Sequence, residues 1–101
     1  MSKITKAAQD KPCTARIPQV CNFDRRTSVW AHLRGIRWGA GERIKPFDLI
    51  GLIACSDCHD AIDGRRKKDK NGHLLDPEFV QTCAYQGHME SLMVLHKEGI
   101  I

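Results

Sequence analysis

The chain has 101 residues and a mass of 11.4 kDa, which leaves room for one domain and excludes a multi-domain enzyme. Its composition of 42% hydrophobic and 28% charged residues is typical of a folded domain, but only 6% of residues are aromatic, so we expect a metal or covalent link to stabilise the small core. The net charge of +4 divides unevenly, because ten basic and three acidic residues precede Asp48, whereas six basic and nine acidic residues lie from Asp48 onward.

The first half of the chain predicts one short helix, a loop and a strand. Residues 3–9 suit a helix that ends before Pro12, because the residue before a proline is disfavoured in helices. Residues 13–22 have no helical period and predict a loop. Residues 28–34 alternate apolar and polar side chains, which indicates a half-buried strand with His32 on its polar face.

The second half predicts a strand followed by three helices. Residues 49–54 are apolar and bounded by turn signals, so we expect a buried strand that pairs with the first. A short helix follows, capped by Ser56 or Asp57 and stopped at Gly64. Asp76-Pro77-Glu78 predicts a further helix start, and Gly87 separates this helix from a last one. We expect their apolar faces to be Phe79, Val80, Cys83 and Ala84, and then Met89, Leu92, Met93 and His96.

The sequence contains no run of about 18 or more apolar residues, as a membrane span requires. Residues 1–6 also lack the apolar region and cleavage site of a secretory signal. We therefore expect an intracellular, cytoplasmic protein without a membrane partner. Its five cysteines then favour metal coordination or redox chemistry over disulfides.

The cysteine spacing predicts a zinc site. Cys13 and Cys21 precede the first strand, and Cys55 and Cys58 follow the second, so a hairpin would bring both pairs to one end. The gap between the first two exceeds the ~2–4 intervening residues of ordinary zinc knuckles, and Cys83 is a reserve ligand, although its apolar neighbours favour a core position. A thioredoxin-like role of the Cys-x-x-Cys pair is the alternative, but the chain lacks the βαβ pattern of that fold.

Two histidines and a carboxylate are the candidates for chemistry. His59 and Asp63 are four residues apart and therefore neighbours on one face of the predicted helix. Three roles fit this pair: both residues bind a hard metal ion, one binds the metal and the other contacts that ligand, or the two form only a polar pair at the surface. His32, on a strand facing His59, would supply the base that phosphodiester hydrolysis needs beside a cation. His73, in the polar loop, is expected to be inert. His88 and His96 would flank the site if the last helix packs there, or they are structural, which is commoner for histidines at a helix edge.

The basic residues suggest contacts with nucleic acid. The run at 65–70, followed by Asn71-Gly72, predicts an exposed loop that either contacts phosphates or is only solvated. Arg34, Lys45 and Arg65 are the candidates for phosphate contacts, because each lies close in sequence to the proposed chemical groups.

The order of these features resembles a known class of enzymes. Two cysteines, a strand ending in Ala-His, a basic loop with an aspartate, an apolar strand and Cys-x-x-Cys-His resemble the HNH, or ββα-metal, endonucleases with a zinc-knuckle support. More closely, the chain is similar over residues 7–100 to the prophage-encoded nuclease family called YbcO, which itself looks related to the phage RecA-dependent nuclease Ref. The motifs that carry this resemblance lie at 13–22, 28–32, 45–50 and 54–63.

The resemblance implies a single α+β domain over residues 1–101, with a ββα-metal core at about 13–65 and helices covering it at about 76–99. It implies a metal-dependent DNA endonuclease in which His32 is the general base and His59 holds Mg²⁺ or Mn²⁺. Two departures matter: Ala31 stands where many HNH enzymes carry a metal ligand, and Asp48 matches the middle asparagine only at a longer spacing. Asp48 or Asp63 would complete the metal site.

Two other functions fit the same residues. A zinc-ribbon module that binds nucleic acid or a recombinase would use the cysteines for folding and would have no need of His32. A degenerate phage accessory protein that recruits a recombinase is the third reading.

Overall fold

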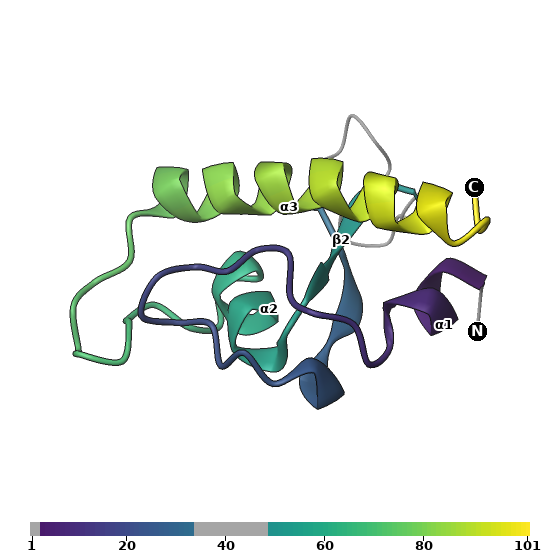
Figure 1. The fold of residues 1–101 in the computed structure, drawn as a ribbon. Coiled ribbons are helices and arrows are strands. Elements are labelled where there is room, and N and C mark those ends of the chain that lie inside the picture. The colour runs from purple at the N-terminus through teal and green to yellow at the C-terminus, as the bar shows by residue number, and fades with distance from the viewer. Residues whose placement is uncertain (1–2, 34–48) are drawn as a thin grey trace.

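The computed structural model describes residues 3–33 and 49–101, so Arg34, Lys45 and Asp48 lie outside the described residues. Helix α3 runs along one side of the molecule, the strand pair and α2 lie beneath it, and α1 lies near its C-terminal end (Figure 1). This is a small α+β fold, as predicted. Its elements are α1 (Lys3–Ala8), the 3-10 helix η1 (Arg25–Thr27), β1 (Val29–His32), β2 (Gly51–Ala54), α2 (Ser56–Ile62) and α3 (Pro77–Lys97).

Strands β1 and β2 pair antiparallel, with Val29 opposite Ala54 and His32 opposite Gly51, so the predicted pairing is confirmed. The expectation of a polar face on the first strand is wrong at Trp30, because both faces are covered in the middle of the strand, whereas Val29 and His32 at its ends stay partly exposed. Ala31 belongs to the larger core beneath α2 and α3, and Trp30 belongs to a second core with α1 and the end of α3. Trp30 is only 5% exposed, since these two helices cover what the sequence pattern marks as the polar face.

The outer edge of β2 has its backbone groups paired by α3 and by the loop after α1. Ser91 Oγ accepts a hydrogen bond from Ile53 N at 2.9 Å, and Thr14 N and Oγ1 donate to Ile53 O at 2.8 and 2.7 Å. A ring nitrogen of His88 lies 2.7 Å from Gly51 O. Unpaired edge groups would be costly to bury, so these contacts fix how close α3 lies to the sheet.

Helix α3 is one continuous helix, which corrects the expectation of two. It begins as predicted, with the Asp76 side chain accepting from Glu78 N at 3.0 Å, but it continues through Gly87 to Lys97. The expected methionine stripe is also wrong, because Met89 is 65% and Met93 67% exposed. Of the described helices, none is long and apolar enough to cross a membrane, α3 included. The side of α3 that is buried carries Val80, Cys83, Ala84, Gly87, Ser91 and Leu95.

Small side chains on α3 allow its close approach to β2. A Cβ atom at Gly87 would lie 2.7 Å from Leu52 Cδ1, 2.9 Å from Thr14 Oγ1 and 3.2 Å from Ala15 N. The residue that the sequence marks as a helix breaker is therefore needed for packing.

We expect Gly87→Ala to lower the free energy of unfolding by about 1–2 kcal/mol, because overpacking costs more than the ~1 kcal/mol gained in helix propensity. Urea denaturation measures this change. The neighbouring exposed position supplies the control, since Gln86→Ala should stay within about 0.5 kcal/mol of wild type. A Gly87→Ala protein more stable than wild type would contradict the close packing.

Candidate functional site

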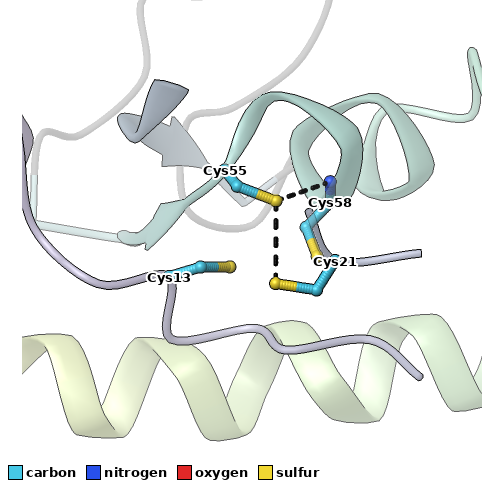
Figure 2. A group of neighbouring side chains, drawn as sticks. All are labelled: Cys13, Cys21, Cys55 and Cys58. Carbon is cyan, nitrogen blue, oxygen red and sulfur yellow. Dashed lines mark hydrogen bonds between the residues drawn. The ribbon is translucent and has the colours of Figure 1, made fainter. Parts of the chain in front are cut away.

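The four predicted cysteines converge. Their Sγ atoms all lie within 4.8 Å of one another, and each residue is buried. Figure 2 shows Cys13 and Cys21 reaching in from the segment after α1, Cys55 from the end of β2 and Cys58 from the first turn of α2. Cys83 is not part of this group and packs in the larger core, as its apolar neighbours indicated.

The geometry and chemistry of this group suit a soft divalent metal. Four sulfurs at about 2.3 Å from a tetrahedral zinc ion lie about 3.8 Å apart, and Cys21 Sγ is 3.8 Å from Cys55 Sγ. The thiols are also crowded: the interaction between the Cys13 and Cys58 thiols lowers the pKa of Cys13 and, with burial, raises the pKa of Cys58. A metal ion replaces the protons of the thiols that bind it. The four cysteines could therefore hold a metal ion such as zinc.

A tight turn explains how the wide gap between Cys13 and Cys21 is accommodated. Ile17 O accepts hydrogen bonds from Val20 N at 3.1 Å and from Cys21 N at 2.9 Å, and Gln19 adopts a φ of +61° within this turn. Ile17 and Val20 are almost fully buried in the larger core, at 1% and 0% exposure. The extra residues are thus anchored by apolar burial, and the turn delivers the second thiol.

Two cations contact the same loop, and sequence reasoning missed both. Arg16 donates to Cys13 O at 3.3 Å and forms a two-pronged pair with Glu90, whose hydrogen bond is the main reason that the pKa of Arg16 is raised. Lys70 Nζ donates to Cys21 O at 3.0 Å. Four thiolates around a divalent ion carry a net charge of −2, so nearby cations stabilise the filled site. Lys70 belongs to the basic run, which was the available signal.

The other two cysteines of the group, Cys55 and Cys58, form the start of α2. Cys55 is the N-cap and its Sγ accepts from Cys58 N at 3.4 Å, so the predicted caps, Ser56 or Asp57, lie one and two residues too late. His59 follows directly, and its Nε2 lies 3.1 Å from Asp63 Oδ2 one turn later. The i,i+4 contact expected from the sequence is present.

Asp63 is shared between His59 and Arg65. Its side chain is only 10% exposed, and Oδ2 lies 3.2 Å from Arg65 Nη2, which also lies 2.9 Å from Asp60 Oδ1. The structure therefore brings three of the predicted site residues together at the C-terminal part of α2. The Arg65 side chain remains 60% exposed.

His32 lies at the end of β1 and is half-buried. Its neighbours Ala31 and Leu33 pack in the core that includes Cys58 of α2, so the alternation of the strand directs His32 to the face of Trp30. This differs from the expectation that His32 faces His59, because α2 packs on the other face of the strand pair.

His88 reaches the residue opposite His32. Its ring nitrogen lies 2.7 Å from the carbonyl oxygen of Gly51, the ladder partner of His32, so α3 brings His88 beside the end of β1, which is one of the two positions expected for this histidine. Within residues 3–33 and 49–101, the four cysteines are the only group of three or more His, Cys, Asp or Glu residues close enough to bind one ion. A second metal would therefore have fewer protein ligands among these residues.

The cysteine group supplies a direct prediction. We expect purified wild-type protein to contain one equivalent of zinc, and Cys55→Ala to lose both the metal and cooperative unfolding, because the loop, β2 and α2 are then no longer joined. Metal analysis and thermal unfolding followed by circular dichroism measure these effects. Cys83→Ala is the matched control: it should retain zinc and lose only about 1 kcal/mol of stability. Zinc loss in both variants would contradict the assignment.

Comparison with known proteins identifies relatives over nearly the whole chain. A family model described as "Putative nuclease YbcO" matches residues 2–100. The proteins of that name from Escherichia coli (strain K12) and Enterobacteria phage 82 are each 42% identical over 101 residues, which is 100% of this chain and 98% of theirs. A solved structure described as a putative bacteriophage protein from Escherichia coli matches with a TM-score of 0.76 and 42% identity, covering 95% of this chain and 99% of that one. The chain belongs to the YbcO family.

Proposed function

We propose that this protein is a metal-dependent endonuclease that hydrolyses DNA phosphodiester bonds through an HNH-type ββα-metal core formed by β1, β2 and α2. The observation that carries the proposal is the contact of His59, Asp63 and Arg65 directly after the buried cysteine group, on the helix that follows an antiparallel strand pair. The name of the family, which describes a nuclease, supports the same reaction class.

We assign zinc to the four cysteines, in a structural role. When bound, the metal would join the loop at 13–21, the end of β2 and the first turn of α2. Because His59 follows Cys58 directly, a metal bound to Cys58 would also fix the backbone position of His59. The four thiols would fill all four coordination positions of a tetrahedral zinc ion, as in structural rather than catalytic zinc sites.

A second divalent ion, Mg²⁺ or Mn²⁺, would be held in part by His59. The 3.1 Å contact with Asp63 suits either of two roles for this carboxylate: it ligates beside His59, or it accepts a ring N–H and orients the imidazole. Mg²⁺ usually keeps several waters, so few protein ligands are enough, and Asp48 is the further candidate. When bound, the ion would stabilise negative charge on the phosphate and the leaving 3′ oxygen.

We assign the general base to His32. It would take a proton from the water that attacks phosphorus in line with the leaving oxygen. Its half-buried side chain at the end of β1 keeps contact with solvent. Arg65, Arg34 and Lys45 would bind phosphate oxygens. A guanidinium has five N–H donors, so Arg65 keeps donors for a phosphate in addition to its contacts with Asp60 and Asp63.

A binding module that uses zinc only for folding is the second candidate. It is favoured by one observation: apart from the cysteines, no third metal-binding side chain joins His59 and Asp63 in the described part of the chain. Such a module would bind nucleic acid and produce no cut ends.

We expect wild-type protein with Mg²⁺ or Mn²⁺ to cut supercoiled plasmid or single-stranded DNA, and His32→Ala to lose at least about 10²-fold in rate, because a general base contributes about 10²–10⁴-fold. Gel electrophoresis of the DNA, with proteins of equal zinc content, measures this loss.

The control for this experiment is His73→Ala. The His73 side chain is 78% exposed on the basic loop, so its removal should leave the cutting rate unchanged. Equal background cutting by wild type and His32→Ala would reject His32 as the base and favour the binding module.

A further inference from the structure

A hollow of about 430 Å³ lies between the end of α2, the N-terminal half of α3 and a basic hairpin, by which we mean residues 65–75. The hairpin is held by a bridge between Lys68 and Leu74 and turns at Gly72, whose φ is +83°. The volume is typical of small-ligand sites. The residues that line it include the apolar Ile62, Leu74 and Val80, the aromatic Tyr85, and the cations Arg66 and Lys67.

Tyr85 and Leu74 give the hollow an aromatic and an aliphatic contact surface. Tyr85 is 41% and Leu74 78% exposed, so both side chains keep surface that a ligand could cover. The Tyr85 hydroxyl accepts a hydrogen bond from Gln81 Nε2 at 2.7 Å, which holds the ring in place. An aromatic ring fixed beside a hollow is a stacking platform for a planar ligand.

Two of the residues that line the hollow, Arg66 and Lys67, carry positive charge. Among the described residues, the Lys67 ammonium has no hydrogen-bond or ion-pair partner, and Arg66 has only a long contact of 3.5 Å with Asp57 besides its bond to Lys68 O. A lining that combines apolar side chains with two cations is complementary to a planar base that carries a phosphate. An apolar peptide would leave these cations unmatched.

We propose that this hollow binds an unpaired nucleobase of a DNA strand, with Lys67 contacting the adjacent phosphate. The proposal rests on the proposed nuclease function and adds the substrate feature that the enzyme selects. Ile62, Gly64 and Arg66 line the hollow and flank Asp63 and Arg65 in sequence, so a base held here would bring its backbone near these proposed site residues. DNA with a bulge or a single-stranded segment should then be bound in preference to continuous duplex.

The test compares three labelled duplexes of equal length: fully paired, with a one-nucleotide bulge, and with an abasic residue at the bulge. Fluorescence anisotropy gives Kd for wild-type protein without added Mg²⁺ or Mn²⁺, so that binding is measured apart from cutting. We expect the bulged base to be bound at least about 5-fold more tightly than the abasic bulge, because stacking on an aromatic ring is lost with the base.

Two variants remove this preference in different ways. Tyr85→Ala should weaken binding of the bulged base by about 5- to 150-fold. Leu74→Ser should also reduce the preference. Because the Leu74 side chain is 78% exposed, this substitution should leave the fold intact. Met93→Ala, an equally exposed change at the other end of α3, is the control and should bind as wild type.

Lys67→Ala should weaken binding of all three duplexes by the same factor. It should also reduce the slope of the logarithm of the binding constant against the logarithm of the salt concentration by about 0.9, the contribution of one phosphate contact. Lys97→Ala should leave that slope unchanged. Equal affinity of wild type for the base and the abasic residue, or equal losses in Tyr85→Ala and Met93→Ala, would overturn the proposal. Base preference without any plasmid cutting would instead reject the nuclease and leave the pocket intact.

Discussion

The convergence of four thiols is the interaction on which the rest of the structure depends. The two strands are four residues each, and the segment between Cys13 and Cys21 contains no helix or strand, so the loop is held against β2 and α2 by its thiols, by the Thr14 bonds to Ile53 and by the buried side chains of Ile17 and Val20. Apolar burial alone is weak in a chain of this size. The buried cysteine group joins all three segments and determines where α2 begins, and with it the position of His59.

The second constraint is the close contact between α3 and the edge of β2. Ser91 and Thr14 bond to the backbone of Ile53, and a glycine at position 87 lets the helix lie against Leu52. Larger side chains at these positions would separate the helix from the sheet and leave buried backbone groups unpaired. The exposed methionines of α3 result from the same arrangement, because the narrow face of small residues is the one that packs.

The sequence predicted those features that depend on local pattern and on the chemistry of residue types. The strand pair, the Asp76 cap, the cysteine group and the His59–Asp63 contact belong to this class. It did not predict the burial of Trp30 or the continuity of α3 through Gly87, because both depend on which elements come together in space. The contacts of Arg16 and Lys70 with the cysteine loop also join residues that no local pattern connects. The role of His32 stays a prediction.

The central claim is that four sulfurs bind one metal and so hold the site together. X-ray absorption at the zinc edge of the purified protein tests this most directly, because it reports the atoms around the metal without relying on activity. We expect four sulfur neighbours at about 2.3 Å and no nitrogen neighbour. A shell of mixed sulfur and nitrogen, or of fewer sulfurs completed by water, would contradict the claim.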